Sequence, residues 1–202
     1  MVQRRKEGVR DAILEAAFEL FSEQGYSETS IPAIARGAGI STANVYVYFD
    51  SKIDILFTLY APWLDERLER LGRSLKRVTD PRIRLRKLLL ALWRDLPRES
   101  NGFANNVMQA VSTSNRNGNY SPRLRELFQG RVAAWVQDCL AVTARESEMI
   151  AGVVLMAFDG FAMNVRLVHG VACNVEIADL FSRLLTAPCG QQPPAAPAGQ
   201  KS

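Results

Sequence analysis

The pattern of apolar and polar residues along the chain predicts helices over most of its length. Apolar side chains recur at three- and four-residue spacing, which is the period of a helix with one buried face. Glycine, proline and small polar residues interrupt this pattern and mark the turns. We therefore expect an all-α protein of about nine helices, which span about 7–24, 31–38, 42–49, 52–78, 82–96, 103–114, 122–142, 146–169 and 174–185.

The stretch from residue 29 to residue 52, TSIPAIARGAGISTANVYVYFDSK, predicts two short helices joined by a tight turn. Ser30 is a suitable N-cap for a helix that begins at Ile31, and Pro32 is tolerated in its first turn. Gly39 can adopt the positive φ that ends this helix. Ser41 can then cap a second helix. Two short helices across a three-residue turn form a helix-turn-helix.

The second helix of this pair has one apolar face and one face left for solvent or a ligand. Val45 and either Tyr48 or Phe49 are expected to point into the core. The second helix of a helix-turn-helix enters the major groove of DNA, where its outward side chains meet the base edges. Asn44 can pair with adenine, and methyl groups can pack on thymine methyls. The predicted base-reading residues are Thr42, Ala43, Asn44 and Val47.

Other polar residues around the same turn are candidates for contacts with the DNA backbone, which fix register without reading sequence. The predicted phosphate-binding residues are Ser30, Ser41, Tyr46, Tyr48 and Lys52. Tyr46 is expected on the outer side of its helix, and Lys52 begins a helix that points at the backbone. Tyr48 is equally well explained as part of the core.

The first quarter of the chain resembles the TetR family of bacterial transcriptional regulators. The residues that carry this resemblance are Ile13, Ala16, Ala17, Leu20, Phe21, Gly25, Tyr26, Thr29, Ser30, Ile34, Ala35, Ala38, Gly39, Ile40, Ser41, Val45, Tyr46, Tyr48, Phe49, Ser51 and Lys52. Where family members often carry Gly or Pro two residues after the turn serine, this chain has Ala43. Asn44 and Val47 are its own. These departures bear on which operator is read.

The resemblance implies a small-molecule pocket in a second helical domain, whose occupation moves the fourth helix. Five large apolar residues are candidates for the lining, and three polar residues are candidates for anchoring a ligand. These effector-pocket candidates are Trp93, Phe103, Asn105, Met108, Gln109, Trp135, Met156 and Asp159. For the large apolar residues, an ordinary place in the core is the alternative. The ligand itself is not predicted.

The last two predicted helices are rich in Ala, Gly and medium apolar residues, including Ala151, Gly152, Val153, Ala157 and Gly160. This apolar surface is wider than one neighbouring helix covers. It favours a homodimer in which these two helices of each subunit form a four-helix bundle, as the resemblance also implies. Two recognition helices about 34 Å apart then read a palindromic operator.

The domains expected are a helix-turn-helix DNA-binding domain over 1–51, an effector-binding and dimerisation domain over 52–187, and a disordered tail over 188–202. The tail contains four prolines and no apolar pattern. With 202 residues, 48% of them apolar, the chain is long enough to bury a substantial core.

Net charge is +4, but residues 1–52 hold six basic and seven acidic side chains, so this region is not generally basic. Its basic residues cluster at Arg4, Arg5, Lys6 and Arg10. This leader is either a solvated terminus or an arm that reaches phosphate or the minor groove. Residues 53–98 carry eleven basic and six acidic side chains, for which we prefer a solvated face over a second DNA surface.

Cysteine usage and hydropathy favour a soluble cytoplasmic protein with no membrane partner. Cys139, Cys173 and Cys189 have no paired or metal-ligand spacing, which argues against a disulfide framework. No apolar run approaches eighteen residues, and no leader with a cleavage site is present. No metal or other cofactor is expected.

An enzyme is the rival class, and the sequence gives it little support. His169 is the only histidine, and it lies on a predicted dimer helix. No Cys or Ser stands in a nucleophile motif, and no glycine-rich phosphate loop is present. We therefore expect a TetR-like regulator, a repressor rather than an activator, that a small-molecule effector releases from DNA. The alternative is an all-α dimeric binding or interaction module that does not act on DNA.

Overall fold

The computed structural model describes residues 2–99, 102–113, 123–165 and 172–187, and within these ranges it contains helices and no strand. This confirms the expected all-α class. None of the described helices combines the length and apolar character needed to cross a membrane. The elements are α1 (Val2–Glu23), α2 (Gly25–Glu28), α3 (Ile31–Gly37), α4 (Thr42–Val45), α5 (Lys52–Lys76), α6 (Pro81–Leu90), η1 (Ala91–Asp95), η2 (Leu96–Arg98), α7 (Phe103–Thr113), α8 (Arg123–Cys139), α9 (Ala144–Asn164) and α10 (Val175–Thr186).

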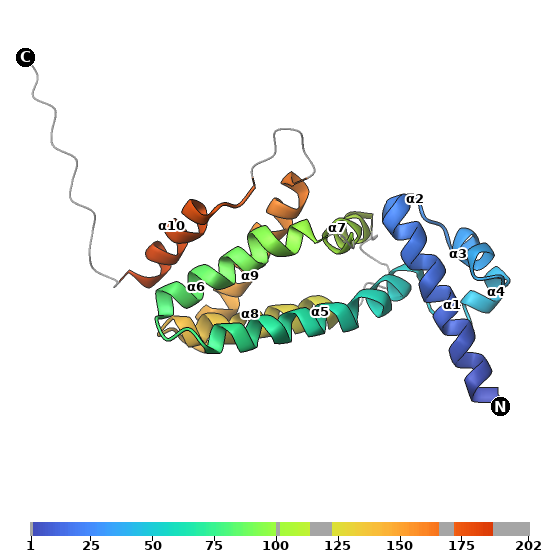
Figure 1. The fold of residues 1–202 in the computed structure, drawn as a ribbon, viewed down its shortest axis with the longest axis horizontal. Coiled ribbons are helices and arrows are strands. Elements are labelled where there is room, and N and C mark those ends of the chain that lie inside the picture. Colours follow the sequence, from blue (N-terminus) through green and yellow to red (C-terminus); the bar gives the residue numbers. More distant parts are fainter. Residues whose placement is uncertain (1, 100–101, 114–122, 166–171, 188–202) are drawn as a thin grey trace, which may run out of the picture.

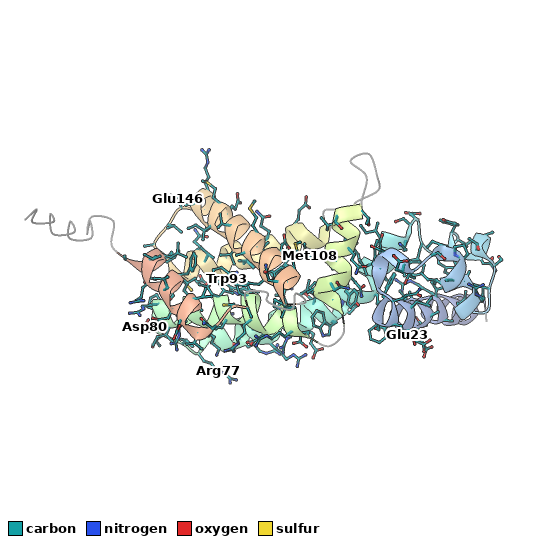
Figure 2. All side chains as sticks on the ribbon, turned by 90° about the horizontal axis from the view of Figure 1, so that it is seen from above. Glu23, Arg77, Asp80, Trp93, Met108 and Glu146 are labelled. Carbon is teal, nitrogen blue, oxygen red and sulfur yellow. The ribbon has the colours of Figure 1, made fainter. Side chains whose placement is uncertain are left out.

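The helices form two groups along an elongated molecule (Figure 1). Helices α1 to α4 form a compact group at the N-terminal end, and α6 to α10 form the larger group. Helix α5 begins beside the first group and runs along the second. In Figure 2, Glu23 at the end of α1 and the Arg77–Asp80 turn after α5 mark opposite regions of the molecule. The domain boundaries given above stay a prediction, since α5 has buried residues along most of its length.

The local signals around the predicted helix-turn-helix appear in the structure. The Ser30 side chain accepts a hydrogen bond from the Ala33 N–H at 3.3 Å, and Ser41 accepts one from the Asn44 N–H at 3.2 Å. Gly39 has a φ of +68°. The regular part of the second helix is shorter than expected, because α4 ends at Val45. The chain continues in tight turns, in which the N–H groups of Tyr48 and Phe49 both donate to the Val45 carbonyl at 3.0 Å.

The single helix expected over 82–96 is divided in the structure. After α6, the N–H of Leu96 donates to the carbonyl of Ala91, which makes a π-helical turn, and a 3-10 turn follows. Pro97 explains the change, because its ring would clash with the carbonyl four residues earlier in a regular helix and it supplies no N–H. The expected bounds placed the end of this helix at residue 96, just before Pro97. Pro97 lies instead inside the 3-10 turn.

The remaining boundaries agree with the expected ones to within a few residues, except that α1 begins five residues earlier, at Val2, and α9 ends five residues earlier, at Asn164. Helix α9 begins earlier, because Thr143 and Glu146 form a reciprocal capping box. Helix α8 ends at Cys139. Helix α2 is a short turn that the sequence did not predict. The residues between the helices expected over 103–114 and 122–142, His169 and the tail at 188–202 lie outside the described residues.

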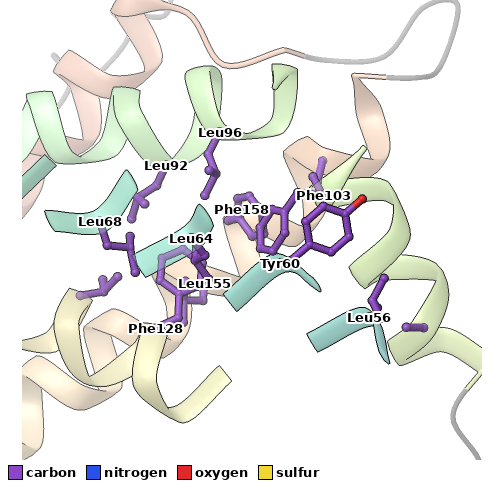
Figure 3. Packing of buried hydrophobic residues seen from close by; sticks show 14 of the residues in the cluster. Leu56, Tyr60, Leu64, Leu68, Leu92, Leu96, Phe103, Phe128, Leu155 and Phe158 are labelled. Atoms are coloured by element: carbon purple, nitrogen blue, oxygen red, sulfur yellow. The ribbon is translucent and has the colours of Figure 1, made fainter. Parts of the chain in front are cut away.

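The core of the larger group is arranged around a stripe on α5. Leu56, Tyr60, Leu64 and Leu68 are buried at four-residue spacing, which places them on one face of the helix. Figure 3 shows this stripe facing side chains of the following helices, among them Leu92, Leu96, Phe103, Phe128, Leu155 and Phe158. The Tyr60 and Phe103 rings meet edge to face with centroids 5.4 Å apart. Each fully buried Leu or Phe contributes about 1.5–3 kcal/mol. On the exposed side, Pro62 interrupts the hydrogen-bond ladder of α5.

We expect Gly39→Ala to lower the free energy of unfolding by about 1–2 kcal/mol, because an L side chain is strained at the positive φ of this turn. No atom lies within 4 Å of an added Cβ, so strain alone sets the effect. The matched control is Gly8→Ala, which is also free of contacts but lies inside α1. There alanine should be neutral or stabilising by up to about 1 kcal/mol. Urea unfolding of both variants measures the difference, and equal effects would contradict the assigned turn.

Candidate nucleic-acid interface

Helix α4 and the turn after it expose one continuous set of side chains. Val45 and Phe49 are buried, as the pattern predicted, and Tyr48 is half-buried against the core. Tyr46 and Val47 are 54% and 71% exposed. Among the predicted base-reading residues, Ala43 and Asn44 are also exposed and Thr42 is partly exposed. The structure therefore gives all four some access to a ligand, while their base-reading role stays a prediction.

The two cap serines can serve the protein and a phosphate at once. As N-caps, Ser30 and Ser41 use a hydroxyl oxygen as acceptor. Each O–H group remains available as a donor, because a serine hydroxyl both donates and accepts. With the exposed Tyr46, they are compatible with the predicted phosphate contacts. The half-burial of Tyr48 leaves both of its proposed roles open.

Lys52 has a structural role that the sequence did not indicate. Its Nζ donates to the carbonyl oxygens of Tyr26 and Thr29, each at 2.7 Å. The same ammonium lies 4.1 Å from the centroid of the Tyr26 ring. Burial lowers the pKa of Lys52, and the charge of Glu28 acts in the opposite direction. Two of its three donors are thus used to fasten the start of α5 to α2. The predicted phosphate contact is untested, and only the third donor is free to make it.

A second polar connection joins the two groups of helices through Asn106 of α7. Asn106 is completely buried. Its Oδ1 accepts a hydrogen bond from the Tyr26 N–H at 2.9 Å, and its Nδ2 donates to the Phe21 carbonyl at 3.1 Å and to Tyr60 Oη at 3.0 Å. Burial raises the pKa of Tyr60, and the hydrogen bond from Asn106 opposes that shift. This one amide therefore holds α1, α2 and α5 to α7.

Gln109 extends the same contact by one turn of α7. Its Oε1 accepts a hydrogen bond from the Ser27 N–H at 2.8 Å. The backbone of α2 approaches closely here because Gly25 has no side chain; a Cβ would lie 2.9 Å from Gln109 Oε1. Gly25 also has a φ of +84°, which permits the abrupt change of direction between α1 and α2.

The opposite side of α7 lines a small cavity of about 80 Å³ between α5, α7, α8 and α9. Three of the predicted effector-pocket residues, Phe103, Met108 and Asp159, lie in its wall. The residues that line it are Phe57, Leu64, Phe103, Val107, Met108, Val111, Phe128, Leu155, Phe158 and Asp159. One helix thus carries both the cavity wall and the contacts to α2.

The structure does not bring the other predicted pocket residues to this cavity. Trp93 and Met156 line a separate apolar groove of about 760 Å³ between α9 and α10, where Trp93 Nε1 donates to the Val154 carbonyl at 2.9 Å. Gln109 faces α2. Trp135 packs against Gly72, where a Cβ would lie 3.3 Å from its ring. Asn105 is half-buried and is not among the lining residues of either space.

Sequence reasoning missed Asn106, although a signal was present. Asn106 lies three residues after Phe103 and four before Ala110, so it falls on the buried stripe of α7. A polar residue on such a stripe must find hydrogen-bond partners in the core. The sequence analysis instead named Asn105 and Gln109, the residues on either side of this stripe, as possible polar anchors for a ligand.

Residues 13–59 match the family model described as bacterial regulatory proteins, tetR family. This range covers the second half of α1, all of α2, α3 and α4, and the start of α5. The N-terminal region of this chain belongs to the TetR family. The match includes the exposed residues of α4 and the connections of Tyr26 and Lys52 described above.

Several regulators show the same relationship. The chain is 42% identical over 84 residues to the HTH-type transcriptional regulator HbdR of Aromatoleum sp. (strain CIB), covering 42% of this chain and 35% of HbdR. It is 34% identical over 64 residues to the fatty acid metabolism regulator protein of Bacillus subtilis (strain 168), covering 32% of this chain and 33% of that protein. These matches therefore span about a third of each relative's length.

The TetR-like fold extends beyond the matched N-terminal region. The solved structure of the fatty acid degradation regulator FadR from Bacillus halodurans aligns with a TM-score of 0.59 and covers 87% of this chain and 96% of that chain. Sequence identity over this alignment is 18%, so it shows a shared fold. The regulator PfmR from Thermus thermophilus aligns with a TM-score of 0.55 at 25% identity, covering 88% of this chain and 95% of PfmR.

We expect Asn106→Ala to lower the free energy of unfolding by about 1–3 kcal/mol, because the buried Tyr26 N–H loses its acceptor. The amide of Tyr26 should also exchange with solvent faster in the variant. The control is Asn105→Ala, a half-buried neighbour on the same helix, which should change stability by less than about 0.5 kcal/mol. Urea unfolding and hydrogen exchange measure both effects. An Asn105→Ala variant as unstable as Asn106→Ala would contradict the assigned contact.

Proposed function

We propose that this protein is a transcriptional regulator that binds operator DNA through α3 and α4. The observation that carries this proposal is the family match over residues 13–59, together with the exposed side chains of α4 inside that range. Asn44 and the methyl groups of Thr42, Ala43 and Val47 supply base contacts. Ser30, Ser41 and Tyr46 hold the DNA backbone. Repression is the simpler outcome, since a dimer bound at an operator blocks access by polymerase.

The apolar surface on α9 and α10 supports a homodimer. Met149, Val153, Met156 and Met163 are each at least 60% exposed on α9, and Phe181 and Leu184 are exposed on α10. Four of them, Met149, Val153, Met156 and Phe181, line the groove between α9 and α10. Exposed large apolar residues gathered in this way mark an interaction surface. We infer that a second copy covers this groove. Two-fold symmetry then places two α4 helices on one face of a palindromic operator.

The cavity beside α7 is the proposed effector site. Its wall is apolar except for Asp159, so an apolar molecule suits it best. The regulator of B. subtilis named above is described as acting in fatty acid metabolism, which is compatible with a ligand that has a hydrocarbon chain. A space of about 80 Å³ is smaller than the usual range for small-molecule sites, so α7 and its neighbours must separate to admit a ligand.

Transmission to DNA follows from the two faces of α7. A ligand that holds α7 away from the cavity favours states in which Asn106 and Gln109 sit differently against α2. The α4 helices of the two subunits then change their separation. Such a ligand lowers operator affinity by the ratio of its affinities for the two states.

We expect Asn44→Ala to weaken operator binding by about 1–3 kcal/mol at specific base pairs, because a direct base contact is lost. Tyr46→Ala should weaken binding to all sequences more evenly. Fluorescence anisotropy with the DNA upstream of the gene, at two salt concentrations, measures both. Arg73→Gln removes an exposed positive charge far from α4 and is the matched control. Binding to the upstream DNA no tighter than to random DNA would mean that the operator lies elsewhere. If selection from random duplexes also yields no specific binding, the alternative of a binding module without DNA is favoured.

We expect Met156→Asp to weaken the proposed dimer by about 3 kcal/mol, roughly a hundredfold in its dissociation constant, because a charge would be buried in an apolar interface. Phe18→Asp is the control, because Phe18 is an exposed apolar residue on α1, away from the groove. Analytical ultracentrifugation over a range of concentrations measures both. A dimer unaffected by Met156→Asp would show that another surface joins the subunits.

A further inference from the structure

A groove of about 370 Å³ lies between α5 and the α6–η1 segment. The proposed DNA-binding surface, dimer surface and effector site do not use it. The Arg77–Asp80 turn joins the two helical segments, which run alongside one another (Figure 1). From α5 the groove receives Arg67, Arg70 and Ser74, which recur at helical spacing. From the other segment it receives Lys87 and Arg94, seven residues apart. Its volume lies within the range of about 300–1,000 Å³ that is usual for small-molecule sites.

The charges around this groove are unbalanced. Four basic residues line it, whereas Asp95 is the one acidic residue among its described lining residues. At one end, Arg67 pairs with Glu99, and Arg94 Nε lies 2.7 Å from the Asp95 carboxylate. These pairs neutralise that end and still leave guanidinium donors unused, because each guanidinium has five.

The basic groups at the other end of the groove have weaker partners. Lys87 Nζ donates to a carbonyl oxygen, that of Ser74, at 3.1 Å. Arg70 pairs with Glu66 at 3.4 Å, but both side chains are at least half exposed, and such pairs contribute little. Lys87 and Arg70 are therefore free to exchange these partners for a stronger anion. A phosphate group suits them, because it accepts bidentate hydrogen bonds from arginine and attracts an ammonium.

The floor of the groove is apolar. Leu71 and Leu90 are partly exposed there, above the buried Leu68, Leu92 and Leu96. A ligand with a flat apolar part gains from covering these leucines, whereas a simple inorganic anion does not. The groove thus combines a cationic rim with an apolar base.

The π-helical turn η1 directs residues to this groove. Ala91, Leu92, Arg94 and Asp95 all belong to it and line the groove, while Trp93 of the same turn lines the separate space between α9 and α10. Single π turns inside helices are frequent at functional sites, because the extra residue reorients neighbouring side chains. The π turn before Pro97 therefore also places Arg94 at the rim.

We propose that this groove binds a phosphate-bearing small molecule of nucleotide size. Arg70 and Lys87 bind the phosphates, and the leucine floor supports the apolar part. The site lies on a different surface from the α7 cavity and from α4, so the inference does not depend on the proposed DNA binding.

Isothermal titration calorimetry of the full chain with ADP, inorganic pyrophosphate and adenosine tests this proposal. ADP should bind at a single site, pyrophosphate more weakly, and adenosine without measurable heat. Arg70→Gln and Lys87→Gln should each weaken ADP binding about tenfold or more, because each removes a charged hydrogen bond. Both residues are exposed, so the variants should fold, and circular dichroism checks this.

The matched control is Arg73→Gln. Arg73 lies one turn from Arg70 on α5 and also forms an exposed ion pair four residues back, with Glu69, but it does not line the groove. ADP affinity should change less than twofold in this variant. Equal losses for Arg70→Gln and Arg73→Gln would mean general surface attraction and would overturn the proposal. Two further outcomes would also overturn it: the absence of saturable ADP binding, and a response to phosphatidylglycerol vesicles or random duplex DNA alone.

Discussion

The arrangement of this protein depends on a buried amide that must keep all of its hydrogen bonds. Asn106 satisfies the Tyr26 N–H, the Phe21 carbonyl and the Tyr60 hydroxyl at once, in a place that water does not reach. Apolar contacts tolerate small sliding motions, but a buried polar group that loses its partner costs about 1–3 kcal/mol. The N-terminal helices are therefore held to α7 in one preferred orientation, and Lys52 fixes the same region from α5.

This arrangement explains how a packed core can still carry a signal. The buried side of α7 is divided between a polar contact with α2 and an apolar cavity wall, and the two meet at neighbouring residues. Asn106 and Val107, for example, are adjacent in sequence, but Asn106 contacts α2 whereas Val107 lines the cavity. A rigid helix that serves both sides cannot respond to one without disturbing the other. In the proposed regulator, this shared helix links an occupied cavity to a displacement of α4.

The parts of the structure that follow from local chemistry were predictable from the sequence. Ser30, Ser41 and Gly39 act at short range, and the helix-turn-helix was expected from them in outline. The alternation of buried and exposed residues around Val45 also followed from helical periodicity. The prediction of one helix over 82–96 was wrong in its second half, because a helix before a proline can either end cleanly or form a π turn. Trp93 and Leu96 are buried at this turn, and the local sequence does not specify their packing.

The functional assignments were hardest where they depended on contacts between distant residues. The eight predicted pocket residues share no local pattern. The structure distributes seven of them among a cavity, a groove, the contact with α2 and the surface of α5, and Asn105 lies at none of these places. Lys52 looked like a phosphate ligand because it begins a helix, whereas its partners are carbonyls 26 and 23 residues earlier in the chain. The sequence therefore predicted which side chains of α4 are exposed, but not the partners of residues in the interior of the second group.

The proline within α5 gives this helix mechanical properties that its length alone would not provide. Pro62 supplies no N–H to the helix ladder and lies on the exposed side, so bending there breaks no regular hydrogen bond at that position. Lys52 is ten residues away, a distance of about 15 Å along the axis at about 1.5 Å per residue. A tilt of about 5° at Pro62 would move the start of α5 by roughly 1.3 Å over that distance. A slight bend in the middle of α5 thus changes the distance over which the Lys52 side chain must reach its two carbonyl partners.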